Sequence, residues 1–251
     1  MFLNMLEGIL IPLAGTTLGA AGVFFLKDTV SEKTEKILIG FAAGIMMAAS
    51  YFSLLAPALD AGSLWEVTAG FMSGMGFLLV LDVVVPHIHM DESEEGMPSG
   101  LSRVSRMLLA VTLHNIPEGM AVGVVFTDWY HGLDTTLSAA MALSLGIALQ
   151  NIPEGAIVAM PLKTQTTKNK AFLYGILSGA VEPAGALLIV FASKVFLPMM
   201  PFLLAFAAGA MIYVINEEMA PSLSKGSHTN MASVCFACGF STMMVLDVWL
   251  G

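Results

Sequence analysis

Eight predominantly apolar runs follow one another along the chain, separated by short polar stretches. Each is about 20 residues long, the length that an α-helix needs to cross the hydrocarbon core of a bilayer. Their apolar residues are continuous rather than alternating, which favours helices over a transmembrane barrel. The expected spans are residues 7–26, 37–59, 67–87, 104–126, 136–160, 171–193, 198–219 and 231–250.

The composition supports the same interpretation. Hydrophobic residues make up 57% of the 251-residue chain and charged residues only 12%, with a mean hydropathy of +0.82. A soluble domain carries about 25% charged residues. No low-complexity linker divides the chain, and its two Cys residues provide no disulfide framework. We therefore predict an all-α membrane protein with a single transmembrane domain over residues 1–251, surrounded by lipid and with no nucleic-acid partner.

The distribution of basic residues predicts the orientation in the membrane. Nine of the ten Lys and Arg residues fall in or beside loops that follow odd-numbered spans, and only Lys194 follows an even-numbered one. Loops rich in Lys and Arg stay in the cytoplasm, so both termini are expected outside. The loops are short, and the first apolar run is not preceded by the basic residues that begin a signal peptide. Both features favour the inner membrane of a prokaryotic cell.

Three glutamates are expected near the middle of the bilayer. Glu118, Glu154 and Glu182 lie close to the centres of spans four, five and six. Each charge at that depth costs at least about 2.5 kcal/mol on insertion scales, and no Lys or Arg lies there to compensate. We expect the carboxylates either to carry protons or to share a cation. The alternative is three separate neutral glutamates in helix contacts.

Two of these glutamates belong to matching hexapeptides. Span four contains His114-Asn115-Ile116-Pro117-Glu118-Gly119, and span five contains Gln150-Asn151-Ile152-Pro153-Glu154-Gly155. Their offset is one span plus one loop, so the copies lie on antiparallel helices at equal depth, as an inverted pseudo-two-fold repeat produces. Within each copy the first and fifth residues share a helix face, and the proline frees a backbone carbonyl.

The side chains of these motifs indicate a transition-metal site. An imidazole nitrogen argues against Mg²⁺ or Ca²⁺ alone, and the lack of Cys and Met in the motif argues against Cu⁺. Zn²⁺, Fe²⁺, Mn²⁺, Co²⁺ and Cd²⁺ remain. Asn and Gln bind metal weakly, which suits a site that must release its ion. We expect the metal as a transported substrate, with Zn²⁺ the first candidate, and no cofactor.

At these motifs the chain resembles the ZIP family of zinc and iron transporters, and specifically its GufA-like branch. The segment Asp82-Val83-Val84-Val85-Pro86-His87-Ile88-His89 is similar to the family's Asp…Pro-His-x-His ending of span three. The segment Asn216-Glu217-Glu218-Met219-Ala220-Pro221 is similar to the paired-acid ending of span seven. The resemblance covers essentially the whole chain and implies a ZIP-type fold; because members are often dimeric, a homodimer is one option.

The resemblance also implies a two-metal centre at mid-membrane. One metal would be held by His114, Glu118, Gln150 and Glu154, and the second by Asn115, Glu118, Asn151, Glu154 and Glu182. The two shared glutamates would bridge the metals. Many members have His where Gln150 stands, and some have Asp where Asn151 stands, so the centre here is less charged.

Further residues are expected toward the two ends of the path. Spans three and seven both end on the cytoplasmic side, where an exit-side metal site would comprise Asp82, His87, His89, Glu217 and Glu218. A solvated helix end is the alternative. By analogy with the family, Met46, Ser53 and Asp60 in and beside span two would line the entrance. The stretch 87–95 either captures metal weakly or forms an acidic loop.

Two other classes of protein stay open at this point. An intramembrane metalloprotease needs a His-Glu-x-x-His motif, but Asn115 follows His114 and no second His lies four residues on. A metal-sensing membrane protein would bind metal without moving it. The chain has no G-x-x-x-x-G-K-[ST] nucleotide-binding loop. We therefore predict facilitated uptake of divalent transition-metal ions into the cytoplasm rather than an enzyme or an ATP-driven pump.

Overall fold

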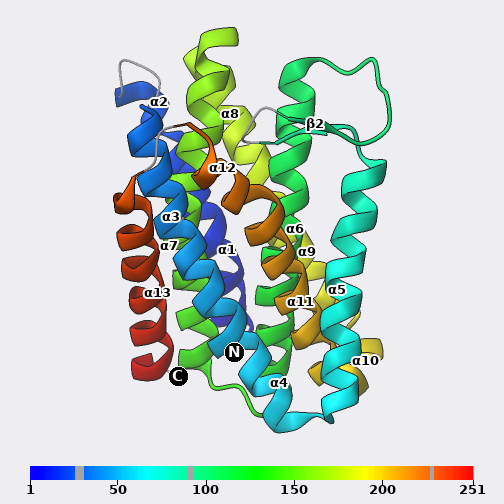
Figure 1. Ribbon diagram of the computed structural model, residues 1–251. Helices are drawn as coiled ribbons and strands as arrows, with labels where there is room; N and C mark the ends of the chain where they lie inside the picture. The colour runs from blue at the N-terminus through cyan, green and yellow to red at the C-terminus, as the bar shows by residue number, and fades with distance from the viewer. Residues whose placement is uncertain (26–30, 90–92, 227–228, 251) are drawn as a thin grey trace.

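A computed structural model describes residues 1–25, 31–89, 93–226 and 229–250, so residues 90–92 of the stretch 87–95 lie outside the described part. Within these ranges, eight helices are long and apolar enough to cross a membrane. They run roughly side by side in one bundle (Figure 1). The predicted all-α architecture with eight spans is confirmed.

The eight spans are built from thirteen α-helices and three short segments of other helix type among the described residues. Span one comprises α1 (Phe2–Ala20) and α2 (Gly22–Phe25), and span two comprises α3 (Glu32–Ala49), the π-helical η1 (Ser50–Leu55) and α4 (Ala56–Ala61). Spans three, four and five are α5 (Leu64–Val84), α6 (Arg103–Tyr130) and α7 (Leu137–Gln165).

The remaining spans are interrupted more often. Span six comprises α8 (Lys168–Gly179) and α9 (Val181–Phe191). Span seven comprises α10 (Ser193–Phe196), the 3-10 turn η2 (Leu197–Met199), α11 (Met200–Val214), the π-helical η3 (Ile215–Met219) and α12 (Ala220–Ser224). Span eight is the uninterrupted α13 (Asn230–Leu250).

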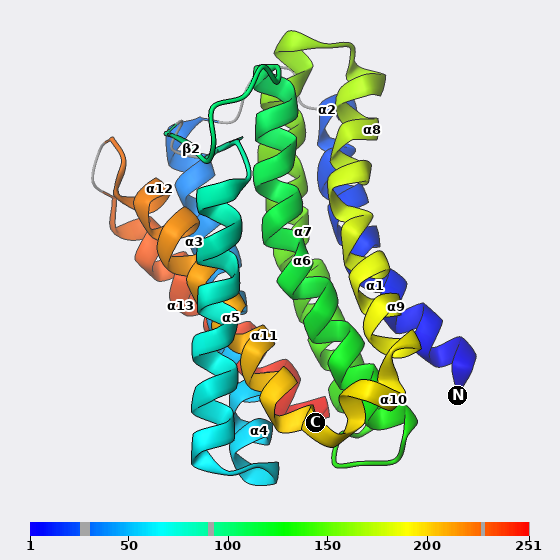
Figure 2. The same cartoon turned by 90° about the vertical axis from the view of Figure 1, so that its right-hand side faces the viewer.

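The helices pack in two groups that lie side by side (Figure 2). The motif group comprises α1, α6, α7, α8 and α9, and the flanking group comprises α3, α5, α11 and α13. Glycines bring backbones into contact inside each group. A Cβ on Gly19 would lie 2.1 Å from the Ile152 carbonyl oxygen of α7, and one on Gly74 would lie 1.9 Å from the Phe206 carbonyl oxygen of α11. Small residues at such positions let membrane helices approach closely.

Two π-helical segments interrupt the flanking group. Each ends at an alanine that precedes a proline, at Ala56-Pro57 in span two and Ala220-Pro221 in span seven. The amide of each alanine donates to the carbonyl five residues back rather than four. The two segments carry Ser53 and Glu218, so residues expected at the two ends of the path lie on locally widened turns, as is frequent at functional sites.

A short hairpin crosses one end of the bundle. Strands β1 (His87–Ile88) and β2 (Glu94–Glu95) pair antiparallel, with His87 opposite Glu95. Gly96 follows with φ +87°, and a Cβ there would lie 2.1 Å from the Val85 carbonyl oxygen, so only glycine fits this turn. Both chain termini lie toward the opposite end of the bundle (Figure 2).

Candidate metal centre

The motif group gathers the seven residues expected at mid-membrane. They come from three helices and all are buried: His114, Asn115 and Glu118 on α6, Gln150, Asn151 and Glu154 on α7, and Glu182 on α9. The charge of Glu154 acts on both Glu118 and Glu182, and Asn151 lies within hydrogen-bonding reach of the same two carboxylates. The basic residues of α6 and α7 lie near the helix ends. The three carboxylates therefore share one depth without a cationic side chain from these helices.

Backbone carbonyls orient two of the amides. Asn115 Nδ2 donates to the Ser178 carbonyl oxygen at 3.0 Å, and Asn151 Nδ2 donates to the Pro12 carbonyl oxygen at 3.4 Å. A carbonyl oxygen only accepts, so the amide nitrogen must face it and the amide oxygen points elsewhere. The third amide nitrogen, Gln150 Nε2, donates to Glu118 Oε1 at 2.5 Å.

These contacts leave an unusual set of acceptors at the centre. Six buried oxygens have no hydrogen-bond donor: Asn115 Oδ1, Glu118 Oε2, Gln150 Oε1, Asn151 Oδ1, Glu154 Oε1 and Glu182 Oε2. Each unpaired buried polar atom costs about 1–3 kcal/mol, and more when it is charged. Acceptors cannot satisfy one another, so this set calls for water, added protons or a cation.

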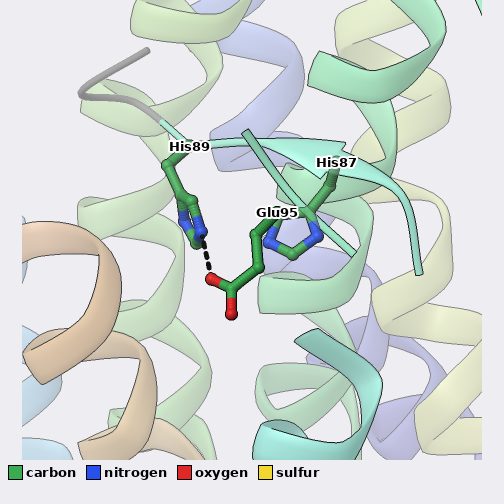
Figure 3. A group of neighbouring side chains, drawn as sticks. All are labelled: His87, His89 and Glu95. Carbon is green, nitrogen blue, oxygen red and sulfur yellow. Dashed lines mark hydrogen bonds and ion pairs between the residues drawn. The ribbon is translucent and has the colours of Figure 1, made fainter. Parts of the chain in front are cut away.

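His114 lies one turn before Glu118 on α6, toward the hairpin. The charges of Glu218, Asp82, His89 and His87, at the hairpin end, act on its ring. Within the described ranges, the one group of three His, Cys, Asp or Glu side chains whose ligand atoms all lie within 4.8 Å is His87, His89 and Glu95. His114 thus stands between two clusters, and the more compact of them is at the hairpin (Figure 3).

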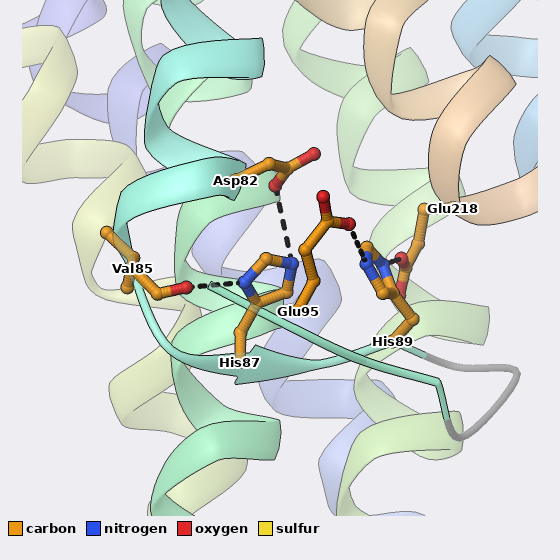
Figure 4. Close-up of polar contacts among 6 residues, drawn as sticks. All are labelled: Asp82, Val85, His87, His89, Glu95 and Glu218. Carbon is orange, nitrogen blue, oxygen red and sulfur yellow. Dashed lines mark hydrogen bonds and ion pairs between the residues drawn. The ribbon is translucent and has the colours of Figure 1, made fainter. Parts of the chain in front are cut away.

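The hairpin fixes the tautomer of His87. Nδ1 of His87 donates to the Val85 carbonyl oxygen at 2.7 Å, which can only accept. In the neutral ring the lone pair therefore lies on Nε2, which faces Asp82 Oδ1 at 3.4 Å (Figure 4). Neither of these two buried atoms has a hydrogen-bond partner. Such a carbonyl contact on the far nitrogen is the usual way of orienting a metal-binding histidine.

His89 lies between two carboxylates. Its Nε2 is 2.9 Å from Glu95 Oε2, and its Nδ1 is hydrogen-bonded to Glu218 of span seven (Figure 4). Burial alone would lower the pKa of this ring, but the hydrogen bonds and charges of Glu218 and Glu95 outweigh it and raise the pKa to about 9. At neutral pH without metal the ring is therefore a cation that ties the hairpin to span seven.

The paired acids of span seven separate in the structure. Glu218 is buried and contacts His89, whereas Glu217 is exposed on another side of the helix. Successive helical residues point about 100° apart, so two adjacent acids on one helix do not face the same site. Of the residues expected at the exit side, Asp82, His87, His89 and Glu218 come together, and Glu95 of strand β2 joins them.

A cavity opens from the hairpin end toward the mid-membrane residues. This hairpin-side cavity has a volume of about 530 Å³ and is lined by His89, Glu218, Val111 and Ile157, among others. Val111 lies about one turn from His114, and Ile157 about one turn from Glu154. The cavity therefore extends from the hairpin cluster to about one turn from His114 and Glu154, on their hairpin side.

A second cavity lies at the end that carries the termini. This terminal-side cavity, of about 520 Å³, is lined by Ser53, Asp128 and Asp247 among others, and Ser53 Oγ donates to Asp247 at 2.5 Å. Of the other residues expected at the entrance, Asp60 is exposed and does not line it, and Met46 is fully buried in the apolar core.

Apolar packing separates this second cavity from the carboxylates. Val122 lies one turn beyond Glu118, and Ile147 lies about one turn before Gln150, both on the side of the terminal-side cavity. Both are essentially inaccessible and belong to the same core cluster as Met46. Apolar side chains therefore close the terminal side, whereas the hairpin-side cavity ends about one turn from His114 and Glu154.

Comparisons with known proteins find related transporters. The family model described as ZIP Zinc transporter matches residues 85–247. Zinc transporter ZIPB of Bordetella bronchiseptica is 37% identical, in an alignment that covers 95% of this chain and 78% of that protein. This chain belongs to the ZIP family. Zinc transporter GufA of Myxococcus xanthus is 36% identical over 95% of the chain and 96% of that protein. Human zinc transporter ZIP11 is 31% identical over 94% of each.

Membership of the ZIP family confirms the predicted resemblance, including its GufA-like character. The three relatives are named as transporters and not as enzymes, which sets the metalloprotease alternative aside. Sequence reasoning did not find two residues that contact the expected ligands. Glu95, which contacts His89, was recognisable only as one acid among several in a loop. Thr16 of α1, which donates to Glu182, was recognisable only as a polar residue one turn after Pro12.

Proposed function

We propose that this ZIP transporter carries divalent transition-metal ions, zinc first among them, into the cytoplasm through the mid-membrane residues. The observation that supports this most directly is the set of six buried acceptor oxygens without donors on α6, α7 and α9. Carboxylate and amide oxygens with a nearby imidazole suit Zn²⁺, Fe²⁺, Mn²⁺ or Cd²⁺. In this proposal the metal is the transported substrate, and the protein needs no cofactor.

The ligand set of the site has room for one or two metal ions, and we include a two-metal centre in the proposal. Glu118, Glu154 and Glu182 carry three negative charges when ionised, and the amide ligands carry none. One dication leaves one negative charge, which a proton can neutralise, and two dications leave one positive charge. In our proposal Glu118 and Glu154 bridge the metals, His114 and Gln150 complete one position, and the remaining ligands complete the other. The ligands of the second position are Asn115, Asn151 and Glu182.

The hairpin cluster supports a release site on the cytoplasmic side. Asp82, His87, His89 and Glu218 would receive the ion as it leaves the centre, and Glu95 would close the set from the hairpin. His87 Nε2 and Asp82 Oδ1 lie 3.4 Å apart without donors, so a cation near them would contact both. Metal binding at His89 requires loss of a proton, because both ring nitrogens face carboxylates in the metal-free state.

Charge and shape support the orientation and the direction of transport that we propose. Eight of the nine basic residues in the described part of the chain lie at or near the hairpin end, so we place this end in the cytoplasm, both termini outside, and the protein in the cell (inner) membrane. The open hairpin-side cavity then represents an inward-facing state. The motif group carries all the mid-membrane ligands, so its movement against the flanking group would expose them to the terminal-side cavity. The homodimer that the family resemblance implies remains part of this proposal, and light scattering of the purified protein measures it.

Uptake by proteoliposomes tests the proposal. We expect Glu154→Ala and His114→Ala to abolish uptake of Zn²⁺ while the purified proteins keep the elution profile and helical content of the wild type. Glu7→Ala, which removes an exposed acid at the start of α1, is the matched control and should transport normally. Wild-type rates in both site variants would end the assignment. Metal binding without uptake by the wild type would instead identify a sensor.

A further inference from the structure

Thr16 is the one described residue of span one whose side chain contacts a mid-membrane ligand through a hydrogen bond between side chains. It is 2% exposed, and its Oγ1 lies 3.2 Å from Glu182 Oε1. The same Oγ1 lies 3.4 Å from the Pro12 carbonyl oxygen. A hydroxyl has a single proton to donate. The carboxylate is both nearer and the stronger acceptor, so Glu182 receives it.

The partner of Thr16 is placed on a short half-helix. Span six breaks at Ala180, and Glu182 lies in the first turn of α9, directly before Pro183. Its Oε1 accepts from Thr16, and its Oε2 is one of the six oxygens without a donor. The two oxygens of a carboxylate lie on opposite sides of its axis. Fixing Oε1 against α1 therefore turns Oε2 away from α1.

Close packing leaves Thr16 little freedom. A Cβ on Gly155 of α7 would lie 2.4 Å from the Thr16 carbonyl oxygen, and a Cβ on Gly179 of α8 would lie 2.9 Å from Thr16 Cβ and Oγ1. Three helices thus meet at this threonine. One turn earlier the same helix offers the Pro12 carbonyl oxygen to Asn151 Nδ2. Span one therefore contacts two of the expected ligands, from neighbouring turns of one face.

We propose that Thr16 is a positioning residue of the mid-membrane site, which holds Glu182 so that its second carboxylate oxygen is available to the metal. This inference rests on the proposed function, because it assigns Thr16 a role at the same site. Hydrogen-bond partners of metal ligands typically change metal affinity by about 10–100-fold when they are removed. We expect the loss of the Thr16 hydroxyl to weaken metal binding about 10-fold.

A set of threonine variants tests the proposal by titration of the purified protein with Cd²⁺. Thr16→Val keeps the shape and removes the donor, so its dissociation constant should rise about 10-fold. Thr16→Ser keeps the donor and should bind as the wild type does. Thr17→Val is the matched control, because the Thr17 hydroxyl donates to the Leu13 carbonyl oxygen of its own helix at 2.7 Å. If Thr16→Val does not fold, Thr16→Ala replaces it, since alanine also lacks the hydroxyl donor and adds no metal ligand.

A double-mutant cycle separates positioning from packing. In the background of Glu182→Ala, which removes the acceptor, Thr16→Val should cause no further loss of affinity. The proposal is overturned if Thr16→Val binds Cd²⁺ within twofold of the wild type, or if it causes the same loss in both backgrounds. Failure of the proposed function gives a different result. If the proposed function is wrong, the variants Glu154→Ala and Glu182→Ala bind Cd²⁺ as tightly as the wild type.

Discussion

The mid-membrane residues and the hairpin cluster meet the same problem, buried carboxylates, in different ways. At mid-membrane, Glu118, Glu154 and Glu182 come from helices of one group and keep oxygens without donors. At the hairpin, the acids Glu218 and Glu95 contact both nitrogens of His89, which is held protonated between them. A site whose acceptors are unpaired is suited to bind a cation, whereas His89 supplies the positive charge at the hairpin itself. In our proposal, the mid-membrane residues are therefore the central binding site and the hairpin cluster is the release site.

Removing one carboxylate from each region should give the largest contrast. Glu118→Gln and Glu154→Gln keep the side-chain volume but remove a charged ligand, so we expect Zn²⁺ uptake to fall by more than about 100-fold, beyond the effect of losing a ligand's partner. Glu218→Gln leaves His87, His89 and Asp82 in place, and uptake should fall by less than about 10-fold. Initial rates in proteoliposomes measure both. Equal losses in the two regions would remove the distinction between them.

Substituting a glycine that packs beside each region should also reduce transport more at mid-membrane than at the hairpin. Gly155→Ala places a methyl group 2.4 Å from the Thr16 carbonyl oxygen, where two helix backbones meet. We expect it to cost about 1–3 kcal/mol of stability and most of the uptake. Gly96→Ala strains a turn with φ +87° and should disturb only the hairpin, with transport largely retained. Melting temperatures and uptake rates of the two variants measure these effects. A larger loss of uptake in Gly96→Ala than in Gly155→Ala would contradict the account.

The charge of His89 should appear in the pH dependence of stability without metal. The pKa of its ring is raised from 6.5 to about 9, so the folded state favours the protonated form. The stabilisation is complete below pH 6.5 and is lost as the pH rises through about 9. In EDTA, the difference in melting temperature between the wild type and His89→Gln should therefore shrink between these limits. A difference that does not vary with pH would show that His89 is not protonated there.

The smallest effect is expected at the outer edge of the hairpin. Arg106 Nη1 donates to Glu94 Oε2 at 2.6 Å, and this hydrogen bond is the main reason that the pKa of Glu94 is lowered. The Glu94 side chain is 59% exposed, and exposed ion pairs contribute about 0–1 kcal/mol. We expect Arg106→Gln to change uptake and melting temperature little, and still less in high salt. A large loss of uptake would bring this pair into the release site.

Much of the architecture can be predicted from the sequence, because a chain that spans lipid must form long apolar helices. Eight apolar runs and two His/Gln-Asn-Ile-Pro-Glu-Gly copies predict the helices and the depth of Glu118 and Glu154. What the sequence does not show depends on contacts between distant segments. Glu95 reaches His89 only through the register of the hairpin, and Thr16 reaches Glu182 only through the packing of α1 against α7 and α8.

Local geometry explains the other differences. Glu217 and Glu218 are adjacent in the sequence, but the rotation between helical neighbours leaves one exposed and one buried. The π-helical turns in spans two and seven also escaped prediction. An Ala-Pro pair ends each of them, but the same pair is equally compatible with an ordinary kink. The turn at Ser53 aims it at Asp247 of span eight, a partner that no local pattern indicates.

The most direct measurement of the central claim is an anomalous difference map from crystals of the protein soaked in Cd²⁺. The account predicts a strong peak among the free oxygens of Glu118, Glu154 and Glu182, and a separate peak beside His87 and Asp82. The mid-membrane peak should vanish in crystals of Glu154→Gln while the hairpin peak remains. Peaks at the hairpin alone, from a protein that transports Cd²⁺, would contradict it.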